Sequence, residues 1–190
     1  FDLRWDPLWK VLHENGMPIH FHGTPGAFTW PSRLPHWSDM EFTCASAMYV
    51  TNTQMGAAST LSAMIFGGML ERYPNLKVVL GESGIGWIPF FLDRMDYEWE
   101  EQFRKGLSLK MKPSEYWRRQ CHATFQYEKS GVQMLKMLGE ETVMWASDFP
   151  HPQGVWPDSQ EYIEKQFSHL EPATKHKIIC GNAVDLYRLG

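Results

Sequence analysis

Short apolar runs alternate with amphipathic stretches along the whole chain. The short runs are rich in β-branched and other apolar residues, as buried strands are, and apolar side chains recur at helical spacing in the stretches between them. Strands that alternate with helices are typical of a parallel α/β fold. The predicted strands occupy residues 17–22, 77–82, 120–125 and 142–148.

Local signals mark the ends of the predicted helices. The first helix begins at Asp6-Pro7, a capping residue followed by proline, and ends at Asn15-Gly16. A long, mostly apolar helix is expected over residues 45–72, with a break near Gly56 or Gly67-Gly68. The remaining helices are predicted at residues 88–103, 113–119, 131–138, 159–167 and 172–189.

Two architectures share this alternation, the doubly wound sheet and the (β/α)8 barrel, and periodicity alone does not separate them. His22, Glu82 and Asp148 stand at the ends of three predicted strands. Both architectures place their ligands at the carboxyl ends of the strands. A flavodoxin-like binding module is therefore one alternative, and it predicts a cofactor at a strand switch point and no metal.

The composition is that of an ordinary globular domain with many aromatic rings. Hydrophobic residues make up 43% and charged residues 21% of the 190 residues, enough for one domain with a sizeable core. The net charge of −4 gives no support for nucleic-acid or membrane-surface binding. Nine tryptophans predict rings at a cleft or interface, because a buried indole N–H needs a partner.

Cysteine usage and the start of the chain bear on its setting. Cys44, Cys121 and Cys180 are odd in number and widely spaced, which favours a reducing compartment, so we expect a cytoplasmic protein. No apolar run approaches the roughly 20 residues of a membrane span. The chain opens with Phe-Asp-Leu-Arg-Trp-Asp-Pro, without a methionine or a signal peptide, so we expect it to be an excerpt of a longer chain.

The residues at the strand ends suggest a metal site. His20 and His22 are two apart on a strand and therefore share a face. Asp148 and Glu82 end apolar strands, where a carboxylate is costly unless it is paired or bound to a metal. One histidine and two carboxylates suit zinc, manganese or iron, and such an ion lowers the pKa of its bound water toward about 7.

Structural roles are the alternative for each of these residues. A histidine is often a hydrogen-bonded core or surface residue, and His20 is the more open to that interpretation. Asp148 and Glu82 could instead cap a helix or bind loop amides. The spacing Gly81-x-x-Gly84-x-Gly86 is a weak phosphate-loop signal, since it lacks the dinucleotide motif and the Walker lysine.

Several motifs occur in a recognisable order. They are Gly-Met-Pro-Ile-His-Phe-His22, the run from Gly67-Gly-Met-Leu to Lys-Val-Val79, Glu82-Ser-Gly-Ile-Gly-Trp-Ile-Pro, Ala146-Ser-Asp-Phe-Pro-His-Pro and Gly181-Asn-Ala. Together they resemble the amidohydrolase superfamily, in the branch that includes aminocarboxymuconate-semialdehyde decarboxylase, resorcylate decarboxylases and lactone hydrolases. The resemblance covers essentially the whole chain.

The resemblance implies a (β/α)8 TIM barrel. A complete barrel needs about 250 residues, so residues 1–190 are expected to form its carboxyl-terminal part, strands five to eight with their helices, within a single domain. The strand-five histidine of the family, a metal ligand, matches His22, and the strand-eight aspartate matches Asp148. The strand-six histidine, a general base in the decarboxylases, falls on Glu82, which is a departure. The family's strand-one metal motif has no counterpart ahead of residue 17.

The implied function is that of a metal-dependent hydrolase or non-oxidative decarboxylase acting on a small carboxylate or a cyclic, lactone-like substrate. His22, Asp148 and Glu82 are expected to bind a divalent ion, zinc first and manganese or iron next. Glu82 and Asp148 are the predicted catalytic residues, with Glu82 as base or further ligand. Residues 24–44 are expected to form a lid, which includes Trp37. The predicted substrate-binding residues are His20, His151, Trp30 and His36.

A second function class is a catalytically incomplete fragment that acts as a structural half-barrel. Half a barrel has two open strand edges, and such edges promote association. We therefore expect a homo-oligomer, or association with a missing amino-terminal half.

Overall fold

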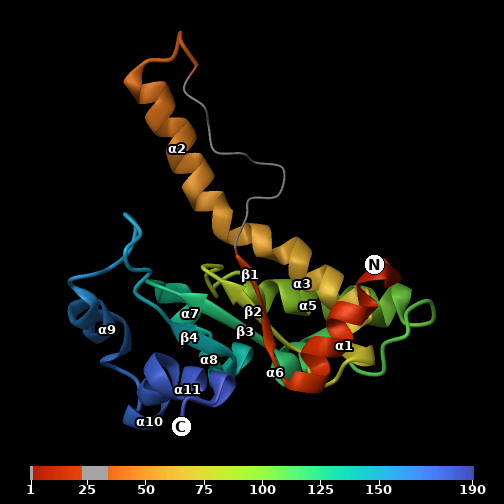
Figure 1. Cartoon of the computed structure of the whole chain (residues 1–190). Coiled ribbons are helices and arrows are strands. Elements are labelled where there is room, and N and C mark those ends of the chain that lie inside the picture. Colours follow the sequence, from red (N-terminus) through yellow and green to blue (C-terminus); the bar gives the residue numbers. More distant parts are fainter. Residues whose placement is uncertain (1, 23–33) are drawn as a thin grey trace.

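A four-stranded parallel sheet forms the centre of the computed structural model, which describes residues 2–22 and 34–190 (Figure 1). The strand order is that of the chain, and every pairing is parallel. The predicted parallel α/β fold is therefore confirmed, and a sheet in chain order has no switch point of the flavodoxin type. The strands are β1 (Pro18–His22), β2 (Lys77–Gly81), β3 (Cys121–Phe125) and β4 (Val143–Trp145).

Helices connect each strand to the next and follow the last. Short 3-10 or π-helical segments extend or join several of them, at Leu3–Trp5, Gln54–Gly56, Trp99–Phe103, Glu140–Thr142 and Lys177–Gly181. The helices are α1 (Asp6–Asn15), α2 (Asp39–Thr53), α3 (Ala57–Phe66), α4 (Met69–Arg72), α5 (Ile88–Glu98), α6 (Pro113–Gln120), α7 (Lys129–Gln133), α8 (Leu135–Leu138), α9 (Ser159–Phe167), α10 (Pro172–His176) and α11 (Asn182–Tyr187).

The second helix begins earlier than the pattern predicts. Ser38 caps α2, since the Glu41 N–H donates to Ser38 Oγ at 3.3 Å and the Ser38 N–H donates to Glu41 Oε2 at 2.7 Å. This reciprocal capping box satisfies donors that a helix start leaves unpaired. The predicted start at residue 45 is therefore wrong, and residues 39–44 of the predicted lid are helical. The expected breaks are present at Gly56 and at Gly67-Gly68.

The two faces of the sheet differ in character. The side chains of Val78, Leu80, Ala123 and Phe125 are buried in the hydrophobic core, to which helices α3, α5 and α6 contribute. Alternate residues of a strand point to opposite faces, and partners in a parallel pair share a face. The opposite face carries His20, His22, Val79, His122 and Thr124.

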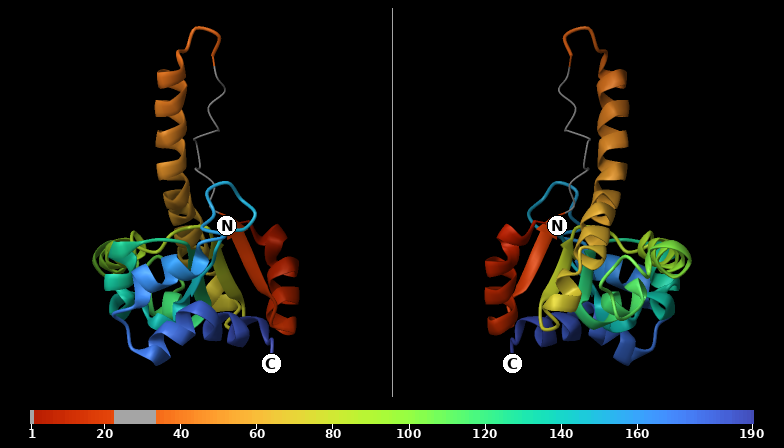
Figure 2. Two further views of the ribbon diagram at one scale, coloured as in Figure 1. Left: turned by 90° about the vertical axis from the view of Figure 1, so that its left-hand side faces the viewer. Right: turned by 90° about the vertical axis from the view of Figure 1, so that its right-hand side faces the viewer.

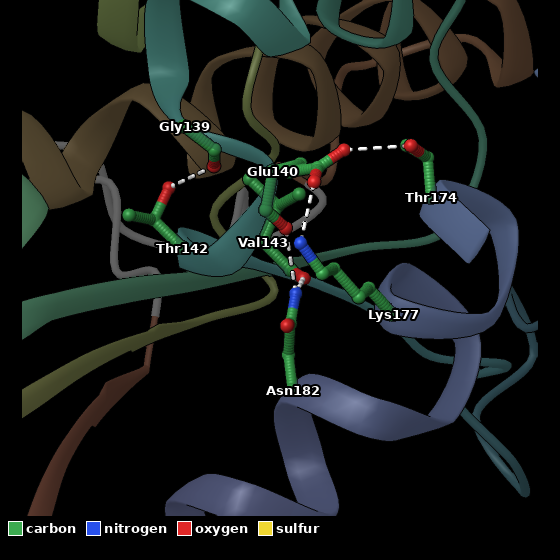
Figure 3. A network of polar contacts seen from close by, with 7 residues as sticks. All are labelled: Gly139, Glu140, Thr142, Val143, Thr174, Lys177 and Asn182. Carbon is green, nitrogen blue, oxygen red and sulfur yellow. Dashed lines mark hydrogen bonds and ion pairs between the residues drawn. The ribbon is translucent and has the colours of Figure 1, made fainter. Parts of the chain in front are cut away.

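The carboxyl-terminal helices are joined to the start of β4 by a buried asparagine (Figure 3). Asn182 Nδ2 donates to the carbonyl oxygens of Glu140 and Val143, at 2.7 Å each. The Glu140 carboxylate in turn accepts from Lys177 Nζ at 2.5 Å and Thr174 Oγ1 at 2.7 Å. These bonds, Lys177 first, lower the pKa of Glu140. The Gly-Asn-Ala motif therefore has a structural role.

Helix α2, which we call the arm, projects from the rest of the molecule (Figures 1 and 2). It lies beyond the edge of the sheet at which the strands have their carboxyl ends. None of its residues is buried, and no charged residue occurs between residues 42 and 70. Even so, no helix in the described ranges combines the length and the apolar character that crossing a membrane requires.

The Asn182→Ala variant should unfold more easily. Two carbonyl groups near the start of β4 lose their donor, and unsatisfied buried groups cost about 1–3 kcal/mol. Urea denaturation should show a loss of about 2 kcal/mol. Asn52→Ala is the matched control, because Asn52 bonds to Met48 on the exposed arm, and it should cost less than about 0.5 kcal/mol. Equal losses of unfolding free energy in the two variants would show that the Asn182 bonds do not stabilise the fold.

Candidate functional site at the strand ends

Three predicted site residues meet where the strands end. His22 is the last residue of β1, Glu82 follows β2 directly, and Asp148 lies three residues beyond β4. His22 Nε2 lies 3.2 Å from Glu82 Oε2. The carboxyl groups of Glu82 and Asp148 are neighbours, since Glu82 contributes to raising the pKa of Asp148. Parallel pairing thus brings one imidazole and two carboxyl groups to one rim, with Glu82 in the middle.

Asp148 is the most enclosed of the three. Its side chain is 11% exposed, and its Oδ2 atom is buried without a hydrogen-bond donor. His151 Nδ1 approaches that oxygen to 3.4 Å. Burial first, and then the Glu82 carboxyl group, raise the pKa of Asp148. A buried carboxylate oxygen without a donor favours a proton or a cation beside it.

Both candidate carboxylates stand on left-handed backbone. Glu82 has φ 49° and Asp148 has φ 58°, and Arg188 is the one other non-glycine residue with positive φ in the described ranges. Such conformations cost about 1–3 kcal/mol in side-chain-bearing residues and gather at functional sites, where the surrounding structure enforces them. The conformation therefore supports a functional role for Glu82 and Asp148.

The loop after β2 is held by one residue of β3 and one that follows it. The Glu82 N–H donates to Thr124 Oγ1 at 2.8 Å. The Glu128 carboxylate accepts from the amides of Ile85 at 2.8 Å and Gly86 at 2.6 Å. An internal carboxylate thus takes the amides that a phosphate group would need, so the weak phosphate-loop signal has a structural explanation. Burial raises the pKa of Glu128, and these two bonds oppose that shift.

Sequence reasoning missed the residues after β3. The Gln126 side chain lowers the pKa of the Asp148 carboxyl group, while Thr124, near the end of β3, and Glu128 hold the loop that begins at Glu82. A signal was present, because Gln126 and Glu128 are polar residues directly beyond an apolar strand, the same feature that singled out Glu82.

The other predicted site residues are dispersed. Tyr187 OH lies 2.9 Å from His20 Nε2, and the two rings stack with centroids 5.6 Å apart. Burial lowers the pKa of His20. His36 is exposed and lies three residues before the start of α2. The amino-terminal end of that helix is the end farther from the sheet (Figure 1). Trp30 lies outside the described residues.

The donor set is chemically suited to a cation but is only part of a ligand shell. Imidazole and carboxylate together bind zinc, manganese and iron, and the donor-free Asp148 Oδ2 fits such a ligand. Within residues 2–22 and 34–190, however, no three histidine, cysteine, aspartate or glutamate side chains form a group ready to hold an ion. His22, Glu82 and Asp148 form a row of pairwise contacts.

Comparison with known proteins identifies the family. The family described as Amidohydrolase matches residues 2–189. The chain belongs to the amidohydrolase family. The predicted resemblance is thereby confirmed.

Two curated amidohydrolase relatives are decarboxylases. The chain is 30% identical over 188 residues to 2-amino-3-carboxymuconate-6-semialdehyde decarboxylase from Dictyostelium discoideum, an alignment that covers 96% of this chain and 48% of that protein. It is 22% identical over 193 residues to γ-resorcylate decarboxylase from Polaromonas sp., with coverages of 96% and 54%. The chain thus spans about half the length of the curated relatives it matches.

Solved structures show the same fold. A 5-carboxyvanillate decarboxylase from Sphingomonas paucimobilis has a TM-score of 0.71 and 28% identity, and the alignment covers 98% of this chain and 54% of that one. An amidohydrolase from Mycobacterium avium subsp. paratuberculosis has a TM-score of 0.73 and 23% identity, with coverages of 97% and 45%. The sheet and its helices are therefore of the amidohydrolase type.

The Gly154→Ala variant should disturb the Asp148 loop. A Cβ atom there would lie 2.7 Å from the Asp148 carbonyl oxygen, 2.9 Å from that of Ser147 and 3.0 Å from that of His151. Backbone groups cannot rotate aside, so overpacking of about 1–3 kcal/mol is expected in denaturant unfolding. In the control Gly106→Ala the nearest atom lies at 3.8 Å, and stability should hardly change. Unaltered stability of Gly154→Ala would contradict this loop geometry.

Proposed function

We propose that this chain forms the metal-binding, carboxyl-terminal half of a non-oxidative decarboxylase that acts on a small carboxylated, cyclic compound. The observation that carries the proposal is the meeting of His22, Glu82 and Asp148 at one rim of an amidohydrolase sheet. Hydrolysis of a lactone-like ring was an equal expectation from the motifs. Both curated relatives are decarboxylases, and this favours release of CO2.

Manganese is the better-supported ion. A dihydroxybenzoic acid decarboxylase from Polaromonas sp. was solved with bound manganese and the inhibitor 2-nitroresorcinol. A 5-carboxyvanillate decarboxylase from Novosphingobium aromaticivorans was also solved with manganese. Zinc, the first expectation from the residues, has no such support. In this chain His22 and Asp148 would hold the ion, with Glu82 either as the catalytic acid–base group or as a further ligand.

The residues divide the chemistry between them. When bound, the ion supplies positive charge that polarises an oxygen of the substrate. In non-oxidative decarboxylation a ring carbon loses CO2 and gains a proton, so a proton donor must stand beside that carbon. Glu82, which neighbours Asp148 and is exposed by 36% at its side chain, is the group suited to deliver it. His151, 3.4 Å from Asp148, and His20 remain proposed substrate contacts.

The open edges of the sheet support the proposal of a half-barrel. β1 and β4 are the end strands of the described sheet, and each has one unpaired edge. Beside β1 an apolar cavity of about 420 Å³ is lined by Trp5, Leu8, Trp9, Phe21 and Met64, among others. Edges and apolar surfaces of this kind are normally covered. We propose that the amino-terminal strands of a barrel cover them and complete the ligand shell of the ion.

Three further expectations stay predictions. Residues 24–44, directly after His22, are proposed as a lid, although their helical end at 39–44 belongs to the arm. Homo-oligomerisation and a cytoplasmic location have no further support.

Turnover should depend on manganese. The purified protein, stripped with a chelator and then given Mn²⁺, should release CO2 from carboxylated phenols or muconate-type acids, and an aromatic lactone should remain intact. CO2 release without added metal would overturn the metal-dependent proposal. Lactone opening without CO2 would favour the hydrolase. If neither reaction occurs with metal present, the non-catalytic half-barrel is the better description.

Exchange of Glu82 for glutamine should separate chemistry from metal binding. Glu82→Gln keeps an oxygen ligand but removes the acid, so kcat should fall by about 10²–10⁴ while Mn²⁺ content is largely retained. His22→Asn should instead lower Mn²⁺ content, measured by elemental analysis. Glu161→Gln, on the exposed surface of α9, is the control and should change neither. Loss of Mn²⁺ in Glu82→Gln would make Glu82 chiefly a ligand.

A further inference from the structure

One buried glutamine is bonded to both loop residues that support the candidate carboxylates. Gln166, on α9, is 4% exposed. Its Nε2 donates to the Gln126 carbonyl oxygen at 2.7 Å, and its Oε1 accepts from the Glu128 N–H at 2.9 Å. The orientation of the amide is determined by these partners, since a carbonyl can only accept and an N–H can only donate.

The first of these bonds connects Gln166 with Gln126, which neighbours Asp148. The carbonyl of Gln126 also accepts from Trp145 Nε1 at 2.8 Å, so its backbone is held from β4 and from α9 at once. The side chain of the same residue lowers the pKa of the Asp148 carboxyl group, so the two groups are neighbours. Gln166 therefore holds the backbone of a residue whose side chain lies beside one candidate carboxylate.

The second bond connects Gln166, through Glu128, with the loop that begins at Glu82. With its backbone N–H held by Gln166, Glu128 directs its carboxylate to the amides of Ile85 and Gly86, in the loop that begins at Glu82. Glycines at 84 and 86 leave room for that carboxylate, since a Cβ at Gly86 would lie 2.9 Å from Glu128 Oε2. The loop conformation thus depends on where residue 128 stands.

We propose that Gln166 is a positioning residue that sets the relative placement of Glu82 and Asp148 from outside the site. Its catalytic consequence rests on the proposed function, whereas its effect on the two loops does not. A side chain that cannot bond would leave the Glu128 N–H and part of the Gln126 carbonyl unsatisfied in a buried place, and the loops would open more often to recover water.

A second buried glutamine provides a matched control. Gln120 is 0% exposed and lies just before β3, at the opposite end of the strand from Gln126. Its Nε2 donates to the carbonyl oxygens of Tyr73 at 2.9 Å and Leu76 at 3.0 Å. Burial, residue type and number of backbone partners are comparable, but Gln120 faces away from the strand ends.

The experiment compares Gln166→Met with Gln120→Met. Amide hydrogen exchange of Ile85 and Gly86, followed by NMR, should be at least about tenfold faster in Gln166→Met, and unchanged relative to the rest of the chain in Gln120→Met. Melting temperature should fall similarly in both variants. The kcat of CO2 release should fall in Gln166→Met alone, with little change in KM.

Gln166→Glu serves if Gln166→Met does not fold. It keeps an acceptor for the Glu128 N–H and loses the donor to Gln126, so Ile85 and Gly86 should stay protected while kcat falls. Equal exchange at Ile85 and Gly86 in the two methionine variants, or unchanged kcat in Gln166→Glu, overturns the inference. Wild-type protein that releases no CO2 but keeps the exchange contrast contradicts the proposed function and leaves the positioning role intact.

Discussion

Parallel pairing of four strands in chain order is the constraint on which the rest of this structure depends. Because successive strands run the same way, their carboxyl ends share one edge, and residues far apart in the sequence meet there. His22 and Glu82 are 60 positions apart yet lie 3.2 Å from each other. The face that carries Val78, Leu80, Ala123 and Phe125 is buried in the hydrophobic core.

The site depends on a second layer of polar contacts. Asp148 and Glu82 both take a left-handed backbone, which their own sequence does not favour. Glu128 bonds to two amides of the loop that begins at Glu82, and the buried Gln166 bonds to the backbone of Gln126 and Glu128. Loops that carry chemistry are normally mobile, and bonds of this kind restrict that motion.

Glu82 is a position at which this chain departs from the family pattern that it resembles. Where the resemblance places a histidine, the chain has a carboxyl group that contacts both His22 and Asp148. Burial first, and then the neighbouring Glu82 carboxyl group, raise the pKa of Asp148. A divalent ion beside the two carboxyl groups would offset both effects.

The sequence by itself determined the alternation of strands and helices, the candidate residues at three strand ends and the family. These depend on local features: apolar runs, capping residues and motifs in order. Only the tertiary structure decided what no local feature contains. Gln126 acquires a role because β3 lies next to β4, and Gln166 because α9 packs over the loop after β3. The capping box at Ser38 starts α2 at Asp39, within the segment that the sequence predicted as a lid. Contacts between distant segments arise from packing, and packing is not a property of any one segment.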